Sequence, residues 1–376
     1  MIIQLTRFLR NAFVMLALSL HCFAEAGNVI VIGQAIDLSG PNSSIGRDYV
    51  AGIKTWFDAI NASGGINGKR VQYIVRDDQG VAELSVKAVS ELIERDQIDY
   101  LFGGVGDGIT QAVLDSPTFK RSGMILFAPL AGISQGGNER VLFWRPSYKK
   151  EIRHLFSHFG KLGIRDVGIA YQESAANQDA YNSLTTEIQD RGMKLTGIAR
   201  IKSNGGQAEM ELEAKRLALS KPGFVLVISD TIGAALFLKE FRNYAPQTFI
   251  ASTSLINLAT LRELAGAKAV EWTVFAQVVP NPNSGATLIQ TEHLNMMKKY
   301  RDEPVSSLTL EGFAAAKALG KTIQQSKRGN SALQELIAQN GGIDLGGLSI
   351  VSSANNNHLS NYLDIALFKK GSGLMF

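Results

Sequence analysis

The strongest constraint on the fold is an alternation of short apolar runs with amphipathic segments. Val29–Asp37 (VIVIGQAID) is a near-continuous apolar run, as expected of a buried parallel strand. After a Gly/Pro/Ser loop, the residues Tyr49, Ile53, Trp56 and Ile60 recur at helical intervals and share one helix face. This alternation predicts an α/β fold, with parallel sheets, right-handed crossovers and helices on both faces.

The same pattern continues along the chain and predicts two sheets. Strands are expected at Val71–Arg76, Tyr100–Gly104, Met124–Ala128, Val167–Tyr171, Phe224–Ser229 and Thr248–Ala251. Helices are expected around Val86–Ile93 and at Ile109–Arg121, Lys149–Leu162, Asp179–Arg191 and Ile232–Tyr244. More than seven strand–helix units in one open sheet would be unusual, so we expect two lobes. Near the end of the chain, Leu348–Val351 and Tyr362–Phe368 flank an Asn-rich turn and predict an antiparallel pair, which argues against a TIM barrel.

Composition excludes several classes of protein. The chain has 376 residues, of which 45% are hydrophobic and 19% charged, too apolar for a disordered protein and long enough for two or three structural units. The 38 basic and 34 acidic residues leave a net charge of +4 that is not gathered in blocks. We therefore expect no nucleic-acid partner.

The first 26 residues have the pattern of a cleaved Sec signal peptide. Arg7 and Arg10 precede the short apolar run Ala12–Leu20, and Ala24–Ala26 (AEA) supplies the small residues of a cleavage site. A buried N-terminal helix is the alternative, and the flanking charges favour the signal. We expect cleavage after Ala26 and export to the periplasm of a Gram-negative bacterium.

Two further features bear on the membrane. Cys22 raises the alternative of a lipoprotein, but His21 stands where a lipobox requires a small residue, so the one cysteine is expected to leave with the signal. Gly223–Leu238 is the most apolar stretch of the remaining chain. Asp230 interrupts it, so it is expected to be a strand, a loop and a helix rather than a membrane span.

Several motifs resemble one family. Ile32–Gly68 carries an L-S-G-P turn after the first strand, then G-x-x-x-x-A-G and I-N-x-x-G-G-I-N-G. Further matches, in order along the chain, are Val75–Asp78 (VRDD), Leu126–Pro129 (LFAP), Phe143–Pro146 (FWRP), Thr309–Ala316 (TLEGFAAA) and Leu345–Leu367. Together they resemble type I periplasmic binding proteins, specifically the solute receptors of ABC transporters in the branched-chain amino acid (Leu/Ile/Val-binding) group.

The resemblance implies an architecture and a function. It implies two doubly wound Rossmann-like lobes, joined by three crossovers near Arg145–Lys149, Val274–Pro280 and Gly342–Gly347, with a ligand cleft between them. The N-terminal lobe would then comprise residues 28–146 and 277–343, and the C-terminal lobe residues 147–276 and 344–376. The expected protein is a monomer without enzymatic activity, cofactor or metal. It would deliver a small-molecule ligand to an inner-membrane ABC permease with its ATPase.

Ligands of open α/β sheets bind outside the carboxyl ends of the strands, which identifies candidate loops. These loops are Leu38–Gly46, Gly104–Thr110, Pro129–Gln135, Gln172–Asn177, Asp230–Gly233 and Ser252–Ile256. The resemblance carries the family's ligand contacts onto these loops and onto the first crossover. The candidate contacts in the N-terminal lobe are Ser39, Ile45, Gly106, Asp107, Gly108, Thr110, Leu130, Ala131 and Gly132. Lys150, Ala176, Asp230 and Thr253 complete the set.

The amino-acid-binding constellation of the relatives is largely absent. Asp107 and Gly132 fall where the relatives have hydroxyls for the ligand carboxylate, and Lys150 falls near their ammonium-binding acid. Asp107 would repel a carboxylate unless protonated or paired with a base, and it could equally cap the following helix. If it faces the cleft, it favours a hydroxyl-rich or amine-bearing ligand. Trp144, beside the first crossover, is a candidate cleft wall.

Rival chemistries have weaker support. Gly104–Gly108 reads G-x-G-x-G, and Ile109 replaces the third glycine of a dinucleotide loop. His154 and His158 have a spacing compatible with zinc, but the Glu of H-E-x-x-H is missing. Ser147–Lys150 matches S-x-x-K without its companion motifs. A periplasmic solute receptor is therefore favoured, with a soluble co-receptor for a chemoreceptor or sensor kinase as the alternative and an exported hydrolase third.

Overall fold

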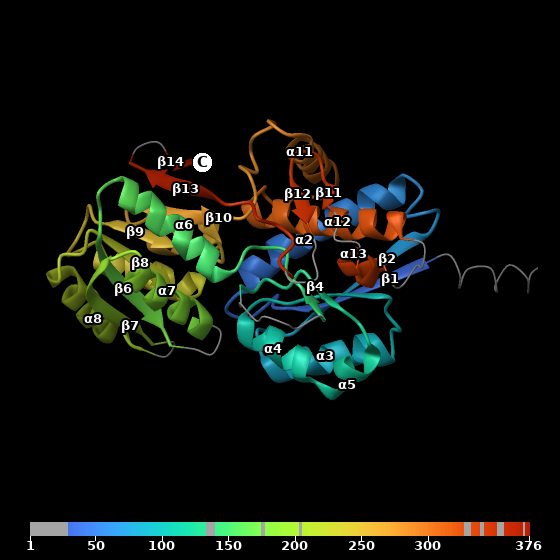
Figure 1. Cartoon of the computed structure of the whole chain (residues 1–376), viewed down its shortest axis with the longest axis horizontal. Helices are drawn as coiled ribbons and strands as arrows, with labels where there is room; N and C mark the ends of the chain where they lie inside the picture. Colours follow the sequence, from blue (N-terminus) through green and yellow to red (C-terminus); the bar gives the residue numbers. More distant parts are fainter. Residues whose placement is uncertain are drawn as a thin grey trace, which may run out of the picture.

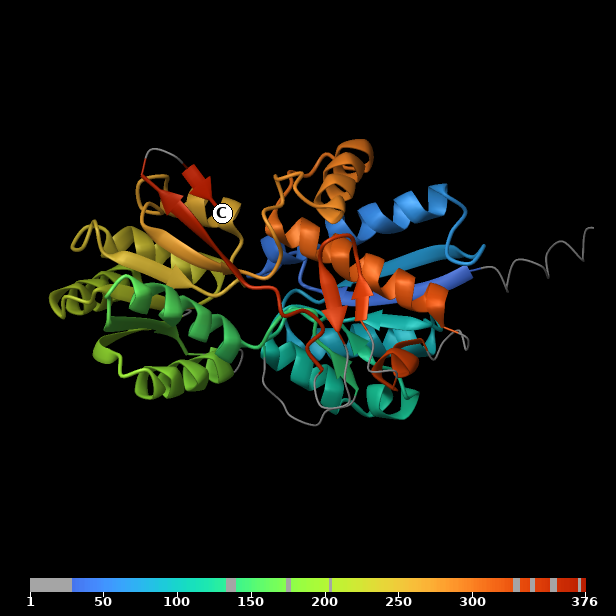
Figure 2. The ribbon, with the colours of Figure 1, turned by 45° about the horizontal axis from the view of Figure 1, so that its top comes forward.

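The computed structural model shows two α/β lobes lying side by side (Figure 1). It describes residues 29–132, 140–173, 177–202, 205–326, 332–338, 342–351, 357–370 and 373–376. Each lobe has its own sheet with helices on both faces, and several segments connect the lobes at the centre of the molecule (Figure 2). The expected signal peptide, residues 1–26, lies outside the described residues.

The N-terminal lobe is built on a parallel sheet of order β2-β1-β3-β4-β5. Its strands are β1 (Val29–Ile36), β2 (Arg70–Asp77), β3 (Tyr100–Phe102), β4 (Leu126–Phe127) and β5 (Val141–Leu142). The helices between them are α2 (Ser43–Ala62), α3 (Ala82–Glu94), α4 (Asp107–Asp115) and α5 (Pro117–Ser122). In β1, Ile32 lies opposite Tyr73 on one side and Tyr100 on the other, so β1 is a central strand, as its apolar run predicts.

The helix predicted over Ile109–Arg121 is two helices in the structure. Pro117 has no backbone N–H and constrains the residue before it to extended backbone, which ends α4. Ser116, with φ −64° and ψ 139°, then caps α5 by accepting the Phe119 amide. The single-helix prediction is therefore wrong at this point.

The C-terminal lobe is built on a seven-stranded sheet of order β14-β13-β10-β9-β8-β6-β7. Its strands are β6 (Asp166–Gln172), β7 (Lys194–Ile201), β8 (Phe224–Ile228), β9 (Phe249–Ser252), β10 (Thr273–Gln277), β13 (Asp364–Lys369) and β14 (Gly373–Met375). Its helices are α6 (Tyr148–Lys161), α7 (Gln178–Asp190), α8 (Gln207–Leu219), α9 (Thr231–Phe241) and α10 (Leu258–Ala265). Gly223–Leu238 forms β8 and the start of α9, and no helix of the described residues is long and apolar enough to cross a membrane.

The chain returns to the N-terminal lobe after β10 and adds helices and a small ribbon. These elements are α11 (Leu288–Tyr300), α12 (Ser307–Gln325), α13 (Ala332–Ala338), β11 (Gly342–Asp344) and β12 (Ser349–Val351). β11 and β12 pair antiparallel, and Ile343 and Ile350 are buried in the N-terminal core. The chain therefore reaches the C-terminal lobe only after Val351, later than the crossing expected at Gly342–Gly347.

The last crossing also explains why one predicted strand pair is wrong. We predicted that Leu348–Val351 pairs with Tyr362–Phe368, but β12 pairs with β11, and β13 pairs antiparallel with β10. Between them the chain runs along the first crossing, where the Ser360 amide donates to the Trp144 carbonyl over 2.8 Å. The two segments therefore belong to different lobes and cannot pair.

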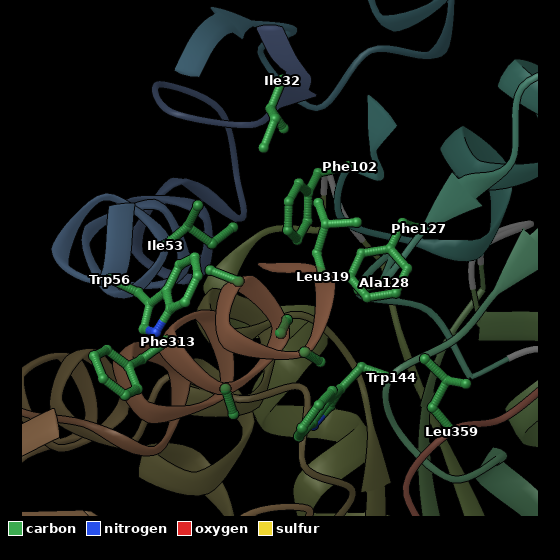
Figure 3. Close-up of a cluster of buried hydrophobic side chains, with 14 of the residues drawn as sticks. Ile32, Ile53, Trp56, Phe102, Phe127, Ala128, Trp144, Phe313, Leu319 and Leu359 are labelled. Atoms are coloured by element: carbon green, nitrogen blue, oxygen red, sulfur yellow. The ribbon is translucent and has the colours of Figure 1, made fainter. Parts of the chain in front are cut away.

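The core of the N-terminal lobe lies around the α2–α12 contact (Figure 3). Trp56 of α2 and Phe313 of α12 pack within one buried cluster, which Phe102 and Phe127 of the sheet also join. Trp144 is part of this cluster and has no exposed surface, so it is a core residue and not the cleft wall considered from the sequence.

Candidate functional site

A cavity of about 350 Å³ lies between the lobes, at the carboxyl ends of strands from both sheets. We call it the interlobe cavity. The N-terminal lobe lines it with Pro41, Asn42, Ile45, Gly80, Val105 and Gly106. The C-terminal lobe lines it with Tyr148, Gln172, Asn177, Ala180, Ile228, Ser229, Asp230, Thr253 and Leu255. Because loops following strands of both sheets meet here, this is the position where an α/β protein of two lobes binds a ligand.

Two buried carboxylates shape the N-terminal wall of the interlobe cavity. Asp37, at the end of β1, accepts the amides of Gly40 at 2.5 Å and Asn42 at 2.8 Å, which fixes the L-S-G-P turn. Asp78, after β2, accepts the Gly80 amide at 3.0 Å. Burial is the main cause that raises the pKa of Asp78 to about 6. The buried side chains of Asp37 and Asp78 thus fix the loops that bring Asn42 and Gly80 to the cavity.

Asp230 places a carboxylate on the opposite wall. It is the N-cap of α9, where its Oδ1 accepts the Gly233 amide at 2.6 Å. Its Oδ2 accepts Nε2 of Gln172 at 2.9 Å, and the Gln172 Oε1 in turn accepts the Asp230 amide and the Ser229 hydroxyl. These bonds fix the orientation of the carboxylate, and the α9 N-terminus favours its negative charge. This wall suits a ligand group that donates hydrogen bonds or carries positive charge.

Asp107 lies neither at the N-cap of α4 nor in the lining of the interlobe cavity. The N-cap of α4 is Gly106, whose φ of 102° is a left-handed conformation that favours glycine, and Asp107 is the first helical residue. Its Oδ1 accepts the Gly132 amide at 3.2 Å and the Tyr148 hydroxyl at 3.5 Å. Asp107 is buried and does not line the interlobe cavity. The capping prediction is therefore wrong, and the carboxylate instead connects the N-terminal lobe to the start of α6.

Four of the candidate contacts come together in the lining of the interlobe cavity: Ile45, Gly106, Asp230 and Thr253. Leu130, Ala131 and Gly132 are buried behind it, and a Cβ on Gly132 would lie 2.8 Å from the Tyr148 ring. Glycine at 132 therefore makes room for an aromatic wall residue.

The remaining candidates lie elsewhere. Ser39 is exposed and donates to Asp77 at 2.6 Å. The Thr110 hydroxyl donates to the carbonyl of Gly106, the N-cap of α4, and Gly108 lies in the first turn of the same helix. Lys150 is exposed on α6 and donates to Oδ1 of Asn361 at 2.8 Å, so it is not in the lining. Ala176 lies outside the described residues.

Several lining residues were not predicted from the sequence. Tyr148 opens α6, Ser229 follows β8, and Gly80 follows β2. The rule that ligands bind beyond the carboxyl ends of strands would have identified Ser229 and Gly80, whereas Tyr148 follows no strand of its own sheet and gave no such pattern.

The residues behind two of the alternative chemistries can be placed in the structure. Across the described ranges, no group of three or more His, Cys, Asp and Glu side chains is arranged to hold a metal ion. His154 and His158 share α6, and burial is the main cause that lowers the pKa of both imidazoles. Lys150 of the S-x-x-K match bonds to Asn361 at the protein surface.

A second, mostly apolar cavity of about 190 Å³ lies beside the second crossing, and we call it the hinge cavity. Ile256, Val278, Leu308 and Phe368 are among its walls. It contains residues of both lobes but is not at the carboxyl ends of the N-terminal sheet. The interlobe cavity is therefore the better candidate for the primary site.

Comparison with known proteins shows which proteins the chain is similar to. A family model described as periplasmic binding protein matches residues 29–372. An amino acid binding protein from Pseudomonas aeruginosa is 29% identical over 60% of this chain and 68% of its own length. Leu/Ile/Val-binding protein homolog 7 from Brucella abortus is 23% identical over 81% of this chain and 79% of its own. The crystal structure of a substrate-binding periplasmic protein from Ralstonia solanacearum has a TM-score of 0.83 at 23% identity, covering 92% of this chain and 99% of that one.

Proposed function

The chain belongs to the periplasmic binding protein family, as its motifs suggested, and on this premise we propose that it is a solute receptor for an ABC importer. It would capture a small polar ligand in the interlobe cavity and present the closed form to an inner-membrane permease. The observation that carries the proposal is the lining of one cavity by loops from both sheets. A ligand that contacts both lobes stabilises the state in which they are close together, which is the physical requirement for closure on binding.

The lining favours a ligand with an amine and a compact apolar part. Asp230 offers a fixed carboxylate to an ammonium group, while Ile45, Val105 and Leu255 offer apolar surface. An amino acid or a related metabolite has this combination of groups. The relatives named for amino acid and Leu/Ile/Val binding support the same class, although the hydroxyl positions of such sites are Asp107 and Gly132 here.

The proposal includes a location and a mode of action. The family is periplasmic, and the N-terminal pattern of charges, apolar run and A-x-A supports delivery by the Sec route. Family and fold are those of binding proteins, so capture and release need no covalent step. The receptor would act as a monomer.

A thermal-shift screen tests the proposal. The purified protein is heated with a panel of amino acids, including leucine, isoleucine and valine, and with amine-bearing and hydroxyl-rich metabolites. A ligand at 100 times its Kd stabilises the folded chain by about 2.7 kcal/mol and raises its melting temperature by several degrees.

The matched variants are Asp230→Asn and Asp115→Asn. Asparagine at 230 keeps the helix cap but removes the charge, so the shift should be lost or strongly reduced. Asp115 is an exposed carboxylate at the end of α4, and its variant should respond like the parent. No shift with any compound, or a shift that Asp230→Asn leaves unchanged, would contradict the proposal.

A further inference from the structure

We infer that Asn257 is a positioning residue that latches the lobes together and couples this latch to the interlobe cavity. Asn257 follows β9 and belongs to the loop Thr253–Asn257, which we call the coupling loop. Asn257 is buried, with 4% of its surface exposed, although it is a polar residue in a loop. Its backbone amide, its side-chain oxygen and its side-chain nitrogen all have partners, and these partners belong to both lobes.

Within the C-terminal lobe, Asn257 is fixed in one orientation. It is the N-cap of α10, where its Oδ1 accepts the Thr260 amide at 3.0 Å. Its backbone amide donates to the Thr231 hydroxyl at 3.1 Å, at the start of α9. Because the cap uses the amide oxygen, the NH₂ group must point away from α10.

That NH₂ group reaches the N-terminal lobe. Nδ2 of Asn257 donates to the Ser44 carbonyl and to Oδ2 of Asp48, each at 3.1 Å, and both acceptors are on α2. The same carboxylate oxygen accepts the Ser306 hydroxyl at 2.7 Å, and Ser306 caps α12. One side chain of the C-terminal lobe is thus bonded to the helix that, with α12, forms the N-terminal core.

The coupling loop carries a second connection at Ser254. Its hydroxyl accepts NH1 of Arg145 at 3.0 Å, and its amide donates to Glu151 at 2.7 Å. Arg145, on the first crossing, is bidentate to Glu311 of α12 at 3.0 and 2.6 Å. These two connections between the lobes therefore start from the same five-residue loop and end on α2 or α12.

Two other residues of the coupling loop face the ligand side. Thr253 and Leu255 line the interlobe cavity, whereas Ser254 and Asn257 line the hinge cavity. A ligand that contacts Thr253 or Leu255 therefore acts on the loop that makes both connections. This inference deepens the proposed function and rests on it for its biological meaning, but the latch itself can be measured without ligand.

Asn257→Asp and Asn257→Ser separate the latch from the cap. Asp and Ser are N-caps as good as Asn, so α10 should remain intact. Asp replaces the donor with a charge that Asp48 repels, and Ser is too short to reach α2. In the double variant Asn257→Asp/Asp48→Asn, the side-chain amide at position 48 can donate to the carboxylate at position 257, so one hydrogen bond is restored in the reverse direction. In Asp48→Asn alone, the side-chain oxygen at position 48 can still accept the Asn257 amide.

Hydrogen exchange of the ligand-free protein, read by mass spectrometry, reports the opening of the latch. Loss of a hydrogen bond to a charged group makes local opening roughly ten-fold or more frequent. Amides of the coupling loop and of the α2 N-terminus should therefore exchange at least ten-fold faster in both single variants of Asn257. Amides of α10 should exchange as in the parent. The double variant should return toward the parent rate, and small-angle scattering should show a larger radius of gyration only for the variants with faster exchange.

Three outcomes would overturn the inference. Unchanged exchange in Asn257→Asp and Asn257→Ser would show that these hydrogen bonds do not hold the lobes together. Faster exchange confined to α10 would show that Asn257 acts only as the N-cap of that helix. Failure of the double variant to recover would mean that Asp48 is not the partner that matters. Because no ligand is added, a negative result in the thermal-shift screen would leave this test unaffected.

Discussion

Asp78 shows how one buried side chain makes the stability of the chain depend on pH. Its carboxyl is fully buried, and its pKa of about 6 lies above the ordinary value of 3.8, with burial as the largest cause and Asp37 and Asp77 as further contributors. Folding therefore favours the protonated form. The associated stability is fully present below about pH 3.8 and is lost as the pH rises through about 6.

Replacing Asp78 by Asn should remove this dependence. At pH 7 we expect Asp78→Asn to be more stable than the parent by up to about 3 kcal/mol, because two pKa units correspond to that free energy. Near pH 4 the two chains should be equally stable. Urea unfolding at several pH values measures the difference, and Asp302→Asn, which changes an exposed carboxylate, is the control. A constant difference between parent and Asp78→Asn at all pH values would contradict the assigned pKa.

At the residue scale, site residues could be predicted where their position depends on the local sequence, and not where it depends on distant partners. Asp230 directly follows a predicted strand, so its place at the cavity could be predicted from local pattern. Asp107 follows a strand too, but its carboxylate bonds to Gly132 and Tyr148, 25 and 41 residues away, and it is not in the lining of the interlobe cavity. Such partners depend on how the lobes pack, which no local pattern contains.

At the scale of elements, the contact between α2 and α12 depends on two glycines. A Cβ on Gly52 would lie 2.0 Å from the Thr309 carbonyl oxygen, and one on Gly312 would lie 2.2 Å from the Tyr49 carbonyl oxygen. Backbone atoms cannot move aside as a flexible side chain can, so the helices touch only because both positions lack side chains.

Gly312→Ala should therefore separate the two helices. We expect a loss of roughly 3 kcal/mol, at the upper end of overpacking costs, because the clash involves backbone. Gly160→Ala is the matched control: it lies in α6, its Cβ would have only Met193 as a neighbour at 3.9 Å, and it should be neutral or stabilising by about 0.5–1 kcal/mol. Chemical denaturation measures both. Equal effects of the two substitutions would refute the argument.

Most helices and strands could be predicted because their periodicity is local. The strands β1, β2, β6 and β8 lie within one or two residues of their predicted bounds. The pairing of β13 with β10, some 90 residues earlier, could not be read in this way, and the Asn-rich turn suggested a nearer partner. Strand existence is a local property of sequence, whereas strand pairing depends on the path of the chain between lobes.

At the scale of the whole molecule, one buried ion pair lies where the lobes meet. Arg145 has no exposed surface and faces Glu311, and the nearby Glu151 is buried as well. Burial is the largest cause that raises the pKa of Glu151. Two buried carboxylates thus share the field of a single guanidinium.

Arg145→Met should leave both carboxylates without this partner. We expect a loss of about 3–5 kcal/mol, the usual consequence of removing one member of a buried pair. Lys120→Met, which breaks the exposed pair with Asp115, should cost at most about 1 kcal/mol. Thermal and urea unfolding at neutral pH compare the two variants, and equal losses would contradict the role assigned to burial.

The discontinuous lobes have a consequence for the order in which the protein can fold. The Thr55 hydroxyl of α2 contacts the Met297 sulfur 242 residues later, and Gly52 of α2 lies against α12 from still further along the chain. The C-terminal sheet likewise needs β13 beside β10. Each lobe therefore keeps an unburied face until segments beyond residue 307 or 364 have arrived. A chain of this topology suits export in an unfolded state, because most of it can cross a membrane before either core is able to close.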